Sequence, residues 1–137
     1  MIDRPDFGDQ VLQTLERALP DHRVVGVWLH GSHARGEAAP PSDVDLAVLA
    51  DRRIDPIALG MAATRLERLA GGRVDLADLR AASGLFRVMA TYEGRLLAAR
   101  DRLGADLFAT HALADHAAFG PNRRRCIEAM KERFRVG

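Results

Sequence analysis

Residues 24–49 read VVGVWLHGSHARGEAAPPSDVDLAVL, and this stretch decides the fold class. Its first part, residues 24–29, is apolar and rich in β-branched side chains, which predicts a buried strand that ends at Gly31. The SHAR segment at 32–35 predicts a short helix, and the segment that follows it contains glycine and proline. DVDLAVL, at 43–49, predicts a second strand. The order strand, turn, short helix, strand indicates a mixed α/β protein.

Helical patterns flank these strands. Apolar residues recur at helical spacing from Phe7 to Leu19, and Asp6 is placed to cap that helix. Asp55 and Pro56 are a favourable opening for a helix that reaches Gly71. The other predicted elements are a strand at 74–79, a helix that Ser83 caps and Gly94 ends, an edge strand at 96–98, and helices from 101 to about 118 and from 122 to about 134. We therefore expect an α/β (α+β) fold, a small mixed sheet flanked by helices.

Size and composition limit the class of protein. A chain of 137 residues and 15.0 kDa suits a single domain over 1–137, with its C-terminal helices beginning at about 101. No apolar stretch approaches the roughly 20 residues that cross a bilayer, and residues 1–10 lack the features of a secretory signal. We expect a cytoplasmic protein. Cys126 is the only cysteine, and a formal charge of +1 gives no general attraction to nucleic acid.

Two carboxylates at the start of the second predicted strand are the main chemical signal. Side chains alternate along a strand, so Asp43 and Asp45 project from the same face. The pair can hold one or two hard cations such as Mg²⁺, which would neutralise the repulsion between them. The VDLADL strand offers a third carboxylate, but Asp75 and Asp78 lie on opposite faces, so only one of them can meet the pair. We choose Asp75 and keep Asp78 as the alternative.

Gly31 and Ser32 begin the turn into the short helix. Free backbone N–H groups and the Ser32 hydroxyl can face an anionic phosphate there, and a side chain at Gly31 would obstruct that approach. Two metal ions on the three carboxylates could activate an attacking hydroxyl and neutralise charge on the transferred phosphoryl group and on pyrophosphate. The residues therefore predict metal-dependent phosphoryl or nucleotidyl transfer.

The spacing of Gly31-Ser32, ten further residues, and then Asp43-Val44-Asp45 resembles the signature of the minimal nucleotidyltransferases (MNT) of the DNA polymerase β superfamily. The segments VDLADLRAAS and YEGRLLAARD also look like MNT antitoxins, and the resemblance covers roughly residues 7–110. It implies a nucleotidyltransferase fold and an antitoxin that uses Mg²⁺ and ATP to transfer AMP to a tyrosine hydroxyl of a HEPN-domain ribonuclease toxin. By the same resemblance, Gly31 and Ser32 would hold the triphosphate, Asp43 and Asp45 the metals, and Asp75 a metal and the incoming hydroxyl.

Other polar residues have weaker claims on function. Arg35 is a candidate phosphate contact, with pairing to Glu37 or a nearby aspartate as the alternative. His30 stands where members of the family often have an aromatic residue, and for His30 and His33 packing or exposure is favoured over a general-base role. Arg123, Arg124 and Arg125 form a solvated helix face or a docking surface for a partner. Without interleaved aromatic residues they do not define an RNA platform.

Two rival functions remain open at this stage. The same catalytic core could transfer a nucleotide to a small hydroxylated molecule such as an aminoglycoside, although the short chain leaves little for a drug pocket. A protein of another class, an antitoxin that neutralises its toxin by binding alone, would not need Asp43 and Asp45 for chemistry. Function must be argued from the site, because one fold supports many activities.

Overall fold

The computed structural model describes residues 4–36, 43–119 and 132. Its centre is a four-stranded sheet in the order β3-β2-β1-β4, built from β1 (Val24–His30), β2 (Val44–Ala50), β3 (Val74–Asp78) and β4 (Arg95–Ala99). Strand β1 pairs antiparallel with both β2 and β4, whereas β2 and β3 run parallel. The parallel pair is joined by a helical crossover, as parallel neighbours require. The mixed sheet is confirmed.

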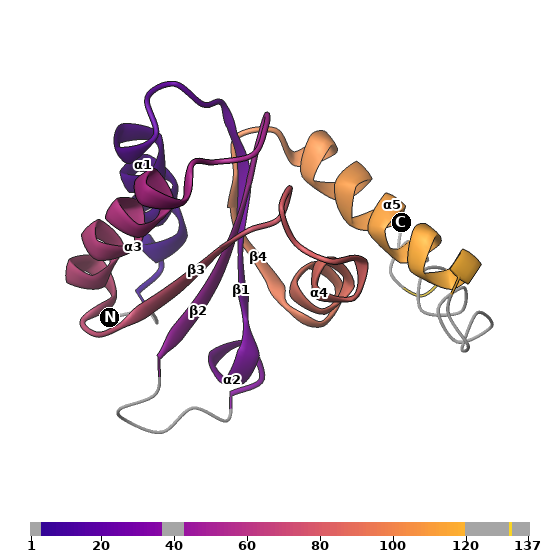
Figure 1. Ribbon diagram of the computed structural model, residues 1–137. Helices are drawn as coiled ribbons and strands as arrows, with labels where there is room; N and C mark the ends of the chain where they lie inside the picture. The colour runs from indigo at the N-terminus through magenta and orange to yellow at the C-terminus, as the bar shows by residue number, and fades with distance from the viewer. Residues whose placement is uncertain (1–3, 37–42, 120–131, 133–137) are drawn as a thin grey trace.

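Helices cover both faces of the sheet (Figure 1). Helices α1 (Phe7–Ala18) and α3 (Pro56–Ala70) pack on one face, over a core that includes Leu29, Leu46 and Val48. Helix α4 (Gly84–Val88), the π-helical turn η1 (Met89–Glu93) and α5 (Arg102–Phe119) lie on the other face. The core on that side contains Trp28, Ala47, Leu49, Leu79, Ala90 and Ala105. Alternate residues of β1 and β2 thus belong to different cores, as strand geometry dictates.

The predicted helix caps have different outcomes. The Asp55 carboxylate accepts hydrogen bonds from the backbone N–H groups of Ile57 and Ala58, and the Ser83 hydroxyl accepts one from Phe86. The prediction for Asp6 is wrong, because its side chain makes no capping bond to α1. Its backbone lacks the extended conformation of an ordinary N-cap, and its carboxylate instead accepts a hydrogen bond from Gln10 Nε2 at 2.7 Å.

Two further differences concern the second half of the chain. The predicted helix between Ser83 and Gly94 changes to a π-helical turn at Met89, where the Gly94 N–H donates to the Met89 carbonyl. The predicted helix at 122–134 and the Arg123–Arg125 cluster lie outside the described residues, apart from helical Glu132. None of the helices within the described ranges combines the length and apolar character needed to span a membrane.

Candidate active site

Asp75, Asp45 and His30 form a row across three neighbouring strands. Asp45 of β2 is the register partner of Asp75 in the parallel strand β3 and of His30 in the antiparallel strand β1. Residues directly opposite in a sheet present their side chains on the same face. That face is the one that carries Trp28 and Ala47, on the side of α4 and α5. The strand pairing therefore brings together two of the three predicted carboxylates and a histidine.

Asp43, the third predicted carboxylate, is the residue immediately before β2. It lies two positions from Asp45 and is exposed, as Asp75 is, whereas Asp45 is partly buried. Burial raises the pKa of the Asp45 carboxyl, and the negative charges of Asp75 and Asp43 raise it further, while His30 and His33 oppose the rise. The three carboxylates are thus close enough to influence one another electrostatically. Their mutual repulsion is a cost that a bound cation would remove.

His30 fills the space between the carboxylates and α4. Its ring meets that of Phe86 edge-on, with the ring centroids 5.3 Å apart. Burial lowers the pKa of His30, although Asp45, a hydrogen bond with the Leu46 backbone and Asp75 each oppose that shift. Its Nε2 atom is buried without a hydrogen-bond partner among the described residues. We therefore assign His30 a packing role within the row that it forms with Asp45 and Asp75, which we call the acidic row.

The turn into α2 (Gly31–Ala34) lies directly against Asp45. Gly31 has φ of +71°, in the left-handed region that favours glycine, and a Cβ at this position would overlap the Asp45 carboxylate. Ser32 follows it on the same short helix and is partly buried. Arg35 is exposed at the end of α2, and its backbone N–H donates to the Gly31 carbonyl. The predicted phosphate-binding turn and the predicted metal-binding carboxylate are therefore immediate neighbours.

Asp78, the alternative third carboxylate, is buried and hydrogen-bonded away from Asp45. It is 7% exposed, and its two carboxylate oxygens accept hydrogen bonds from the backbone N–H groups of Ile54 at 2.8 Å and Arg80 at 3.0 Å. The bond from Ile54 connects the end of β3 to the loop that leads into α3, and the bond from Arg80 is local to the turn after β3. Asp78 is also off the register row, opposite Val48 rather than Asp45. Asp75 is the acidic residue of β3 that lies beside Asp45.

The side chains at this site are of the chemical type that binds a divalent cation. Carboxylate oxygens are the protein ligands that Mg²⁺ prefers, and Asp43, Asp45 and Asp75 supply them around a space that Gly31 keeps open. Among the described residues, no three side chains of the His, Cys, Asp and Glu types already converge as a metal-binding group. Metal binding would therefore require the acidic side chains to reorient, as mutually repelling carboxylates do when a cation joins them.

Sequence reasoning missed the place of His30 in the acidic row. Strand alternation puts His30 on the same face of β1 as Trp28, but its neighbour on β2 depends on the pairing register. The connection between these antiparallel strands, residues 31–43, includes α2 and does not itself fix the register. Pairing them so that Leu29 meets Leu46 places His30 opposite Asp45.

Replacing Asp45 with Asn should raise the stability of the metal-free protein at pH 7. The pKa of Asp45 is raised from an unfolded value near 3.8, so the folded state binds the proton more tightly than the unfolded chain does. The folded protein therefore loses stability as the pH rises from the pKa of Asp45 in the unfolded chain to its higher pKa in the folded state. An Asn at this position does not ionise, so the variant does not lose this stability. Thermal unfolding in EDTA between pH 3.5 and 8 is the measurement, and the difference from wild type should grow with pH.

Asp51→Asn is the matched control for this prediction. The pKa of Asp51 is lowered, first by its hydrogen bond from the Arg23 backbone N–H, at 3.0 Å. Asp51 therefore contributes stability above its unfolded pKa, and this contribution is lost as the pH falls through the lower folded pKa. Its Asn variant should show no gain at pH 7. An Asp45→Asn protein that melts below wild type at pH 7 would contradict this account of the acidic row.

Comparisons with known proteins agree with the fold and the motif. Residues 13–103 match the family described as Polymerase beta, Nucleotidyltransferase. The protein adenylyltransferase MntA of Shewanella oneidensis is 28% identical over 120 residues, which cover 88% of this chain and 84% of that protein.

Two solved structures of toxin–antitoxin systems are also similar to this chain. A toxin–antitoxin crystal structure with AMP-PNP matches with a TM-score of 0.72 and 27% identity, over 88% of this chain and 95% of that chain. The structure of a tri-AMPylated Shewanella oneidensis HEPN toxin in complex with an MNT antitoxin matches with a TM-score of 0.66 and 25% identity, over 89% and 93%. The family match covers more than half of the residues of this chain. The chain therefore belongs to the polymerase beta nucleotidyltransferase family.

Proposed function

We propose that this protein is an antitoxin that transfers AMP from ATP to a tyrosine hydroxyl of a cognate HEPN ribonuclease toxin and thereby neutralises it. One observation carries the proposal. The Asp45–Asp75 register pair lies against the Gly31 turn, in a chain similar over 88% of its length to a protein adenylyltransferase. The AMP-PNP-containing toxin–antitoxin structure and the complex with a tri-AMPylated HEPN toxin support ATP as the donor and a HEPN protein as the acceptor.

Each candidate residue has a role that suits its position. The Gly31 and Ser32 turn would hold the triphosphate beside the carboxylates, with Arg35 as a further phosphate contact. Asp43, Asp45 and Asp75 would hold Mg²⁺ ions, which when bound supply charge neutralisation on the phosphates and a lower pKa for the attacking hydroxyl. Asp75 would also orient that hydroxyl, since it is exposed on the edge strand β3.

The exposure of two of the three carboxylates favours a macromolecular acceptor. Asp43 and Asp75 are both exposed, and β3 is an edge strand of the sheet. A tyrosine presented on the surface of another protein can therefore approach Asp75 without entering a deep pocket. Transfer of AMP would place a phosphodiester on that tyrosine and release pyrophosphate, so the toxin would gain mass and negative charge.

Neutralisation by binding alone is the second candidate, and the structures of relatives in complex with their toxins favour it. The two candidates differ in whether Asp43 and Asp45 are needed. If binding is sufficient, an Asp43→Asn/Asp45→Asn protein still suppresses the toxin. If transfer is required, that variant forms the complex but leaves the ribonuclease active.

The chemistry is tested with ATP labelled at different phosphates. The protein is incubated with Mg²⁺, a HEPN protein encoded beside it, and ATP carrying ³²P at either the α or the γ position. The proposal expects α-label, and no γ-label, on the HEPN protein. Label from γ-ATP would indicate phosphoryl transfer, and absence of both labels with an intact complex would leave binding as the function.

A further inference from the structure

A groove lies beside the last residues of β3, at the outer edge of the sheet. No strand within the described ranges pairs with that side of β3. The groove has a volume of about 340 Å³ and lies between α3, the end of β3 and α4. Its apolar walls, which define what we call the β3 groove, are formed by Leu59 of α3, Ala77 of β3, Ala81 and Ala82 of the turn that follows, and Phe86 of α4.

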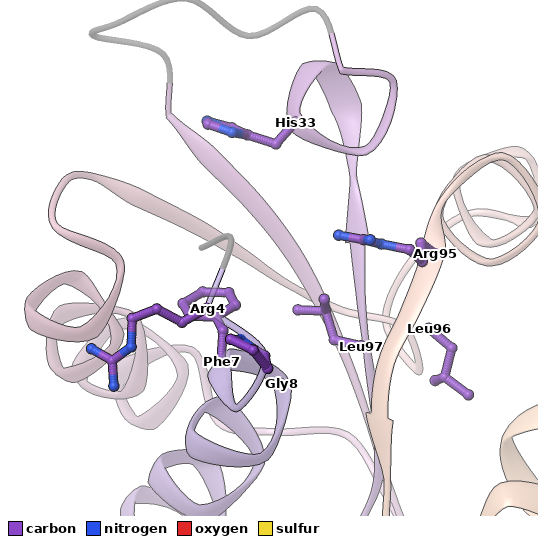
Figure 2. Close-up of a pocket in the computed structure, with 8 residues that line it drawn as sticks. Arg4, Phe7, Gly8, His33, Arg95, Leu96 and Leu97 are labelled. Carbon is purple, nitrogen blue, oxygen red and sulfur yellow. The ribbon is translucent and has the colours of Figure 1, made fainter. Parts of the chain in front are cut away.

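A cavity at the opposite edge of the sheet has a different character. Its volume is about 480 Å³, and it lies between the first turn of α1, the start of β4 and α2, with the basic side chains of Arg4, His33 and Arg95 among those that line it (Figure 2). His33 belongs to the same short helix as Gly31 and Ser32, so this cavity adjoins the proposed triphosphate turn. The β3 groove lies at the other edge, on the side of Asp75.

The polar side chains that border the β3 groove are engaged by the chain itself. The oxygens of Asp78 accept hydrogen bonds from the backbone N–H groups of Ile54 and Arg80, and the Ser83 hydroxyl accepts one from Phe86 at 3.2 Å. A charged ligand would lose its hydration here without equivalent new bonds, whereas an apolar side chain would gain by leaving water. The groove therefore favours an apolar occupant.

The apolar surface continues from the groove along α4. Leu85 is 56% exposed and Met89 is 47% exposed, although both are large and apolar. Met89 follows Phe86 by three residues and Leu85 by four, so the three side chains are neighbours on the helical surface. Adjacent exposed apolar side chains of this kind mark a surface that contacts another molecule.

The β3 groove is continuous with the acidic row. Asp75 and Ala77 are two residues apart in β3, so they share a face of the strand and lie about 7 Å apart along it. Phe86, on the opposite wall, meets the ring of His30 edge-on, with the centroids 5.3 Å apart. A molecule that fills the groove is therefore held immediately beside Asp75, which we have proposed to orient the attacking hydroxyl.

We propose that the β3 groove receives an apolar side chain of the acceptor protein, from the surface around the tyrosine that is modified. The inference rests on the proposed AMP transfer and states how its acceptor is recognised. A second copy of this chain is a poorer occupant, because it would cover Asp75, which an acceptor tyrosine must reach. The side chain in the groove would act as an anchor that fixes the position of the tyrosine relative to the carboxylates.

The variant Ala82→Gln tests the inference by filling the groove with a longer, uncharged side chain. Ala82 is partly buried on the turn after β3 and is not part of the acidic row. The affinity for the HEPN partner is measured by calorimetry in EDTA without ATP, and the rate of AMP transfer is measured against partner concentration. We expect the Kd and the KM for the partner to rise about tenfold or more, with no rise in the KM for ATP.

Ala114→Gln is the matched control, at an exposed alanine of α5, and should bind the partner as the wild type does. Leu85→Gln provides a second variant at an exposed position, where the fold tolerates the change, and should weaken binding by a smaller factor. Thermal unfolding of each variant checks that the fold is retained.

Weaker partner binding by Ala82→Gln and Leu85→Gln, but not by Ala114→Gln, supports the docking groove. Partner affinity unchanged by Ala82→Gln and Leu85→Gln, or lowered equally by all three variants, would overturn it. Self-association of the wild type that Ala82→Gln abolishes would also overturn it, by assigning the groove to a second copy. Because affinity is measured without ATP, a partner that binds through the groove but gains no AMP would count against the transfer reaction and not against the groove.

Discussion

Replacing Gly31 with Ala should reduce AMP transfer to the HEPN partner by about 100-fold or more, the scale of loss that follows from misplacing a reacting group by about 1 Å. The new Cβ would overlap the Asp45 carboxylate, so the carboxylate or the start of α2 must move. The φ of +71° adds a backbone cost of about 1–2 kcal/mol for a residue with a side chain. The initial rate of transfer at saturating ATP is the measurement.

Gly36→Ala is the matched control for this effect. Gly36 has nearly the same backbone conformation, with φ of +70°, but a Cβ there meets no described atom within 4 Å. Both variants carry the backbone cost, and only Gly31→Ala disturbs Asp45. Thermal unfolding should show similar losses of stability in the two proteins. Equal rates of transfer in both variants would contradict the role of the Gly31 turn.

Asp78→Ala should lower the free energy of unfolding by about 2–4 kcal/mol, because it leaves one buried and one partly buried backbone donor without an acceptor. Those donors are the N–H groups of Ile54, whose bond holds the loop before α3 against the end of β3, and of Arg80, whose bond closes the turn after β3. Asp75→Ala, in the same strand, should change stability by no more than about 0.5 kcal/mol, as expected for an exposed side chain. Urea unfolding of the two variants measures the difference.

For AMP transfer, in contrast to stability, the change at Asp75 should have the larger effect. Asp75→Ala removes a proposed metal and hydroxyl ligand, so the folded variant should lose nearly all AMP transfer. Asp78→Asn retains an acceptor oxygen and, at a temperature where it is folded, should transfer at close to the wild-type rate. A folded Asp78→Asn protein that is inactive beside an active Asp75→Ala protein would assign the third carboxylate to Asp78.

Much of the architecture was predictable because local patterns agree with one another. Apolar runs at 24–29 and 43–49 and the helical period from Phe7 correspond to β1, β2 and α1, with ends that differ by no more than one residue. Strand alternation also predicted that Asp43 and Asp45 share a face. The choice of Asp75 over Asp78 required more, because the parallel register of β2 and β3 depends on a helical crossover between them.

Three features escaped prediction, for different reasons. Asp6 has the residue type of a cap, but Gln10 and Arg4 compete for its carboxylate. The change to a π-helical turn at Met89 has no marker in the local sequence, which reads as one helix up to Gly94. His30 became part of the acidic row only through its pairing with Asp45. Long-range strand pairing decided the place of His30, whereas the Asp6 carboxylate is engaged by residues no more than four positions away.

The intact mass of the HEPN partner tests the central claim most directly. The partner is incubated with ATP, Mg²⁺ and either the wild-type protein or its Asp43→Asn/Asp45→Asn variant, and complex formation is checked by size-exclusion chromatography. The account predicts a gain of one or more AMP masses with the wild type, and no gain with the variant although the complex still forms. An unchanged mass with the wild type, or the same gain with the variant, would contradict it.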